Sequence, residues 1–240
     1  MSSRNRLIAC AAAVLLAGCG MTPEEEAKQI EEGLLATPGA EEHWRTIKEE
    51  FPDDFAALVA KVQALDDADR GDEAKLIEIG ANWMLEFQTR ILPDAVKAPP
   101  KELLAWSAAE GDLYATLQRG AVEQCAQLTM GQSIRIDQSN AVATAAMARR
   151  NLAIIRASAA AMRDPQQYPE PSEAAFTRLG DAIAATGLDP KLQAALASES
   201  DMLALSPEQQ CKIGVAIYAG LRSLPDDAEP EMAAYMMTIE

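Results

Sequence analysis

Three arginines repeat at seven-residue intervals in a chain that is otherwise strongly acidic. On an α-helix, Arg149, Arg156 and Arg163 would fall within about 40° of one another. Guanidinium groups bind carboxylates and phosphates through paired hydrogen bonds, so the stripe has two interpretations. It is either a face that is solvated or paired with glutamates of a neighbouring helix, or a shallow site for an anion: a wall fragment, a lipid headgroup or an acidic partner. We expect the first, because the intervening alanines offer little bulk to desolvate a guanidinium.

Two further residues suggest catalysis, but their surroundings do not support it. His43 is the single histidine, and no orienting carboxylate, nucleophile or additional zinc ligand stands at usable spacing. We therefore interpret His43 as a surface residue. Glu110 lies in a stretch with helical character, and a glutamate acting as general acid needs a hydrophobic pocket that the sequence does not show. We interpret Glu110 as structural.

Methionines near the C-terminus are the remaining candidates for metal binding. Met232, Met236 and Met237 carry the soft ligands that suit Cu(I), but their spacing is also typical of an amphipathic packing helix, which we favour. Pairs of consecutive aspartates elsewhere lack the alternate spacing of a calcium loop. The sequence therefore predicts no metal site, no cofactor and no catalytic residues, and we do not expect an enzyme.

The first nineteen residues resemble the signal of a bacterial lipoprotein. Arg4 and Arg6 precede an apolar run from Leu7 to Leu16, which has the length of a signal h-region and is too short to span a bilayer. The run ends in Leu16-Ala17-Gly18-Cys19, which resembles the lipobox of these proteins. The alternative is a plain secretory signal that contains a cysteine.

The resemblance implies lipidation and a location. Residues 1–18 would be removed, and Cys19 would carry a diacylglyceryl thioether and an acylated amine. Several acyl chains anchor a protein stably in a bilayer, whereas one chain is marginal. Gly20 stands where an aspartate would retain an enterobacterial lipoprotein in the inner membrane. The resemblance therefore implies an anchor in the outer membrane, with the body on its periplasmic side.

Two cysteines remain after this processing, Cys125 and Cys211. Because the periplasm is oxidising, we expect them to form one disulfide, the alternative being two buried free thiols. In the chain-entropy model, closing so long a loop stabilises the fold by ~4–5 kcal/mol. There is no Cys-x-x-Cys pair, so we do not expect a redox function.

The negative net charge excludes nucleic acid as a partner. The 240 residues include 21 basic and 37 acidic ones, a net charge of −16 that becomes −18 once Arg4 and Arg6 are lost with the signal. Nucleic-acid phosphates would repel such a protein, and anionic lipid would keep its body off the membrane surface. The hydrophobic fraction, 49%, is ordinary for a globular protein.

Composition and helix-start signals predict the elements that must position these residues. Alanine makes up roughly a fifth of the chain, which favours helix. The dipeptides Thr22-Pro23, Asp189-Pro190 and Ser206-Pro207 are typical helix starts, and Asp53, Asp72 and Ser172 are plausible N-caps. Helices are predicted over 23–36, 41–50, 53–67, 72–91, 100–118, 121–130, 138–163, 172–186, 190–198, 207–223 and 230–239. The fold class is therefore all-α, an irregular bundle of about ten helices with one disulfide in its C-terminal half.

Proline-containing breaks divide the chain, including Pro93 and the step Pro99-Pro100. We predict a signal peptide over 1–18, a lipidated acidic stalk over 19–38, an N-terminal helical subdomain over 39–98 and a C-terminal helical domain over 99–240.

The function that these features favour is a lipid-anchored, non-enzymatic structural or protein-interaction module of the cell envelope, with the bilayer and an envelope protein as partners. One alternative is an acidic binding or inhibitor module for a cationic partner such as a wall-degrading toxin. A less favoured alternative is a cryptic wall hydrolase, a class that the sequence Ala109-Glu110-Gly111 brings to mind. Wall-lytic transglycosylases follow their glutamate with serine and a later Gly-Leu-Met-Gln segment, and this chain has neither.

Overall fold

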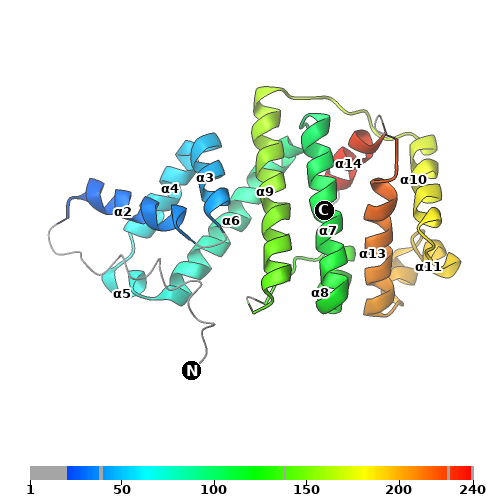
Figure 1. The fold of residues 1–240 in the computed structure, drawn as a ribbon, viewed down its shortest axis with the longest axis horizontal. Coiled ribbons are helices and arrows are strands. Elements are labelled where there is room, and N and C mark those ends of the chain that lie inside the picture. The colour runs from blue at the N-terminus through cyan, green and yellow to red at the C-terminus, as the bar shows by residue number, and fades with distance from the viewer. Residues whose placement is uncertain (1–20, 38–39, 138, 226–227, 239–240) are drawn as a thin grey trace. The chain divides into compact units, whose positions relative to one another are not determined.

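The computed structural model describes residues 21–37, 40–137, 139–225 and 228–238, and within them every regular element is a helix (Figure 1). These helices are α2 (Pro23–Leu35), α3 (Glu41–Glu50), α4 (Pro52–Gln63), α5 (Asp67–Arg70), α6 (Glu73–Ala95), α7 (Pro100–Gly120), α8 (Val122–Thr129), α9 (Ala141–Arg163), α10 (Glu173–Ala185), α11 (Pro190–Ala195), α12 (Glu199–Leu203), α13 (Pro207–Leu221) and α14 (Glu229–Thr238). The expected all-α class is confirmed.

Side-chain caps begin several helices where the sequence predicts them. At α2, the Thr22 hydroxyl accepts a hydrogen bond from the Glu25 amide, and the Glu25 carboxylate accepts one from the Thr22 amide. Asp189 caps α11, and the backbone amide of Ser206 donates to the Gln209 side chain at the start of α13. These bonds satisfy amides that the first helical turn leaves without an intrahelical partner.

Two local expectations are wrong. Phe51 is the N-cap of α4, which begins at Pro52, so Asp53 lies in the first turn, where its charge complements the helix dipole. The break expected at Pro93 is absent, because α6 continues to Ala95. Pro93 has no amide hydrogen, so one intrahelical bond is lost there, and the helix ends two residues later.

The chain divides into two compact units, Met1–Ile91 and Leu92–Glu240. The division falls inside α6, ahead of the Pro99-Pro100 step where we expected a boundary. Each unit has its own buried core.

Aromatic side chains form the core of the N-terminal unit. The rings of Trp83 and Phe87, on α6, stack with centroids 5.0 Å apart. Phe87 also meets Phe51 edge to face at 5.2 Å, and Trp83 lies 6.0 Å from Trp44 on α3. Aromatic pairs of this kind contribute about 0.5–1.5 kcal/mol beyond the area they bury. A few large rings therefore compensate for the small number of core residues in this unit.

The acidic stalk expected over 19–38 is wrong for the part that forms α2. This helix packs on α3 and α4 through Ile30, which is 4% exposed. Lys48 bonds Glu31, and the Gln63 side chain donates to the Pro23 carbonyl at 2.8 Å. The many glutamates of this segment suggested a solvated helix. One face of α2 is nevertheless apolar, and that face makes α2 part of the N-terminal unit.

Helix α13 is central to the C-terminal unit, where it packs against α7, α8 and α10 (Figure 1). Two glycines allow this close approach. A Cβ on Gly214 would lie 2.3 Å from the Thr129 hydroxyl and 2.4 Å from the Tyr114 ring. A Cβ on Gly220 would lie 2.9 Å from the backbone nitrogen of Ile183. Neither position has room for a side chain.

We predict that Gly214→Ala destabilises the protein by about 3 kcal/mol, because the added methyl group overpacks a contact that is already closed. Gly180→Ala in α10 is the matched control, since its Cβ meets nothing within 4 Å. That change should stabilise by up to about 1 kcal/mol through helix propensity. Urea unfolding compares the two variants, and equal stabilities would contradict the close packing of α13.

Candidate functional site

The predicted disulfide is present. Cys125 on α8 and Cys211 on α13 are bonded, with Cα atoms 5.1 Å apart, and both are fully buried. The bond closes a loop over a sequence separation of 86 residues within the C-terminal unit. It therefore fastens α13 to α8 covalently at the place where the two helices also pack.

We predict that neither cysteine reacts with an alkylating reagent in the denatured, unreduced protein, and that both react after reduction. Either Cys→Ser change should cost about 4 kcal/mol, because the unfolded chain regains the freedom that the bridge removes. Mass spectrometry of the alkylated chain checks the first expectation, and urea unfolding checks the second. Labelling of both thiols without reductant would show that no bridge forms.

The arginine face of α9, defined as Arg149, Arg156 and Arg163, consists of exposed side chains. Buried residues lie on other sides of the same helix, including Ile155 and Ala157. α9 contains four arginines and no acidic residue, so its exposed side is basic. This exposure fits both interpretations of the stripe, a solvated or surface-paired face and a shallow anion site, so the choice between them stays a prediction.

A buried ion pair is the feature that the sequence did not reveal. Glu110 on α7 is fully buried, and its Oε2 accepts a hydrogen bond of 2.7 Å from Nε of Arg150 on α9. The sequence offers one indication of this pair, the position of Arg150 on the helix. Arg150 lies about 100° around the helix from Arg149, so it is outside the seven-residue repeat and on another side of α9. A carboxylate buried against a guanidinium has no access to a wall polymer, which agrees with the structural interpretation of Glu110.

Other polar and aromatic groups surround this part of the core. The hydroxyl of Ser107 donates to Glu229 at the start of α14, with the two oxygens 3.1 Å apart. The rings of Tyr114 and Tyr218 stack with centroids 4.9 Å apart, and Trp106 meets Tyr218 edge to face. One face of α7 is thereby held to α13 by ring contacts and to α14 by a hydrogen bond.

We predict that Glu110→Ala costs about 3–5 kcal/mol of stability, because it leaves the Arg150 guanidinium without its buried counter-ion. The matched control is Asp94→Ala, which breaks a pair with Lys97 whose side chains are both 52% exposed. An exposed pair contributes about 0–1 kcal/mol, so the control should unfold nearly as wild type does. A double change of Glu110 and Arg150 to apolar residues should recover part of the loss. Equal unfolding midpoints for Glu110→Ala and Asp94→Ala would refute the buried pair.

The interpretation of His43 as a surface residue is wrong. His43 is 9% exposed and lies beside Trp44 and Ile47, which are also buried on α3. Residues at these positions share one side of a helix, and that side of α3 faces the core of the N-terminal unit. The glutamates that precede His43 suggested that its side chain is exposed to solvent. The apolar residues that follow it determine which side of the helix is buried.

The methionines of α14 are packing residues, as expected. Met232 and Met237 are 1% and 0% exposed, and Met236 is half-buried. Among the described residues, no group of three or more histidine, cysteine or acidic side chains is placed to hold a metal ion.

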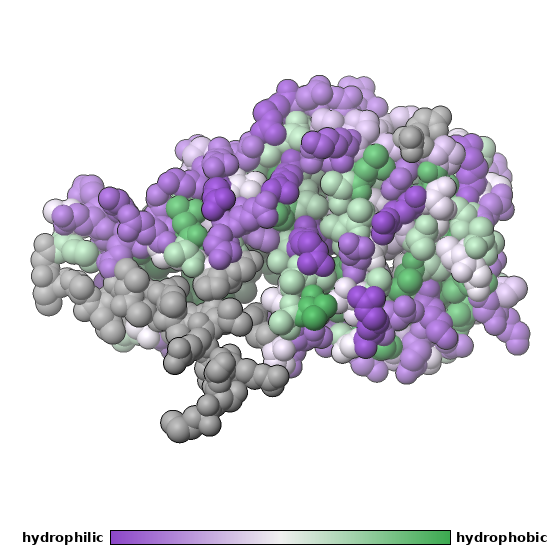
Figure 2. Space-filling model, viewed as in Figure 1, coloured by the Kyte–Doolittle hydropathy of each residue, from purple (hydrophilic) through white to green (hydrophobic). Residues whose placement is uncertain are grey.

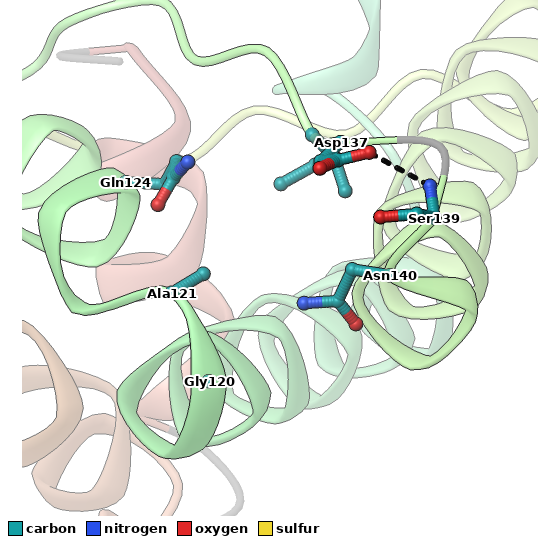
Figure 3. A pocket seen from close by; sticks show the side chains of 7 residues that line it. Gly120, Ala121, Gln124, Asp137, Ser139 and Asn140 are labelled. Atoms are coloured by element: carbon teal, nitrogen blue, oxygen red, sulfur yellow. Dashed lines mark hydrogen bonds between the residues drawn. The ribbon is translucent and has the colours of Figure 1, made fainter.

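A polar hollow lies where α7 ends and α9 begins (Figure 3). Its volume is about 290 Å³, and Gly120, Ala121, Gln124, Ile136, Asp137, Ser139 and Asn140 line it. The backbone amide of Ser139 donates to the Asp137 carboxylate at 2.8 Å. This bond and a further one from the Ser139 side chain lower the pKa of Asp137, which is therefore ionised at neutral pH.

Comparison with models of protein families, with curated proteins and with solved structures finds no match to this chain. Cys19, the expected site of lipidation, lies outside the described residues. None of the helices within the described ranges has the length and apolar character needed to cross a membrane.

Proposed function

We propose that this protein is exported, lipidated at Cys19 and anchored to the outer membrane, where its helical body binds another envelope protein and catalyses no reaction. The observation that carries the proposal is a buried disulfide downstream of a lipobox-like signal. Disulfides form and persist in oxidising compartments, which is where such a signal would deliver the chain.

The Cys19 anchor predicts a specific processing defect. Cys19→Ser should leave a full-length precursor that takes up no labelled palmitate, because the acylated thiol is gone. Cys10→Ser is the matched control: it removes the other cysteine of the signal and should mature normally. Gel mobility, palmitate labelling and membrane fractionation check both variants. Normal maturation and labelling of Cys19→Ser would overturn the proposal.

The net negative charge is divided unevenly between the two units, and this favours a second candidate function. Residues 19–91 contain eighteen acidic and seven basic residues, a net charge of −11. The remaining 149 residues contain nineteen acidic and twelve basic residues, a net charge of only −7. A concentrated negative field accelerates encounter with a cationic protein and excludes anionic competitors. In this second proposal, the N-terminal unit is the binding surface for a cationic partner such as a wall-degrading toxin.

Crosslinking in living cells, followed by identification of the bound protein, tests the two candidates together. For a cationic partner, we predict that Glu24→Gln/Glu49→Gln weakens capture and that added salt abolishes it. Both residues are exposed in the N-terminal unit. The control, Asp181→Asn/Glu199→Gln, removes two exposed charges from the C-terminal unit and should capture normally. A partner retained at high salt by both variants would support the first candidate alone, and the absence of any crosslinked protein would overturn both.

A further inference from the structure

Helix α9 lies at one edge of a row of helices in the C-terminal unit, where α9, α7, α13 and α10 follow one another side by side (Figure 1). Its 23 residues include four arginines and no aspartate or glutamate. Val142 lies seven residues before Arg149, on the same side of the helix, and is 65% exposed. The side chains among the arginines are small: Ala145, Ala153 and Ala160. A second protein surface can therefore approach the arginine face closely.

Helix α3 of the N-terminal unit presents the opposite charge with the same repeat. Glu42 and Glu49 are exposed and seven residues apart, and the exposed Glu41 lies beside them. Arg45 is also exposed on this side, so acidic residues outnumber it three to one. An α-helix rises about 1.5 Å per residue, so seven residues place two side chains about 10.5 Å apart on one side. The two glutamates therefore have the separation of successive residues in the arginine face.

This match allows two guanidinium–carboxylate contacts to form at once, each with paired hydrogen bonds. Arg149 and Glu49 make no ion pair with any residue that the structure describes. An exposed ion pair contributes little to stability, so arginines that pair on the surface of one molecule can change partners when another molecule binds. Over the C-terminal unit, hydrophilic residues are interspersed with smaller apolar groups on the face drawn in Figure 2.

We propose that the arginine face of α9 binds the acidic side of α3 in a second copy of this protein. Each copy carries both surfaces, so the contact joins unlike surfaces and can continue from one molecule to the next. An anionic lipid surface is a poorer partner, because it repels a chain whose net charge is −16. The contact goes beyond the proposed function and depends neither on the lipid anchor nor on an envelope partner.

Salt should act on this association in two opposite ways. At about 0.01 M salt the Debye length is about 30 Å, so the net charge of −16 on each copy opposes contact. At about 0.1 M the Debye length is about 10 Å, which screens that repulsion more than it screens ion pairs in contact. At about 1 M it is about 3 Å, and the ion pairs weaken as well. We therefore expect the association to be strongest near about 0.1 M salt.

Sedimentation equilibrium of the purified full-length chain, over a range of protein concentrations, tests the proposal through a charge exchange. Arg149→Glu and Glu49→Arg should each weaken self-association at least about tenfold, because each change places like charges opposite one another. An equimolar mixture of the two variants should associate as the wild type does, because the reversed charges then face opposite charges. The matched control is Arg178→Glu, which reverses an exposed arginine on α10 and should associate normally.

Thermal melting of each variant confirms that it folds. The proposal is overturned if the wild-type chain stays monomeric at every salt concentration, or if Arg149→Glu associates as the wild type does. It is also overturned if the mixture associates no better than each variant alone. Binding of the wild type, but not of Arg149→Glu, to phosphatidylglycerol vesicles would assign the arginine face to lipid headgroups and reject the second copy as its partner.

Discussion

Close approach of α13 to its neighbours is the constraint on which the C-terminal unit depends. At Gly214 and Gly220, atoms of α7, α8 and α10 occupy the space that a side chain would need. The Cys125–Cys211 bond lies one turn before Gly214 and joins the same pair of helices, α8 and α13. A tight contact contributes dispersion energy only while its geometry is kept, and the disulfide limits how far the helices can separate. Packing and covalent bond therefore reinforce each other.

The Glu110–Arg150 pair constrains the neighbouring interface in a different way. Bringing two charges into a protein core costs several kcal/mol for each ion, which their attraction offsets only in good geometry. The pair is thus poor evidence of net stability, but it joins α9 to α7 at one defined contact inside the C-terminal unit. In the same unit, the arginine face of α9 is exposed and Asn140 lies beside the end of α7, where the polar hollow forms.

Most of the fold was predictable because local signals and packing agree. Caps at Thr22, Asp189 and Ser206 begin helices where the sequence places them, and the disulfide followed from cysteine number and the expected compartment. The errors concern which side of a helix is buried. His43 and Ile30 of α2 have glutamates close by in sequence, yet both side chains are buried in the N-terminal unit.

The sites were less predictable, because they depend on residues that are distant in sequence. The repeat of the arginine face was visible and its exposure expected. The partner of Arg150 is forty residues away on another helix, and no periodicity connects the two. The hollow joins the end of α7, one residue of α8 and the connection to α9, which become neighbours only after folding.

Hydrogen exchange of the oxidised protein, followed by mass spectrometry, tests the central role of α13 most directly. If the C-terminal unit is built around this helix, amides of α13 and of the facing part of α7 exchange most slowly and open only with global unfolding. Short helices at the edge, α11 and α12, exchange earlier. Exchange of α13 amides as fast as those of α11 and α12 would contradict the account.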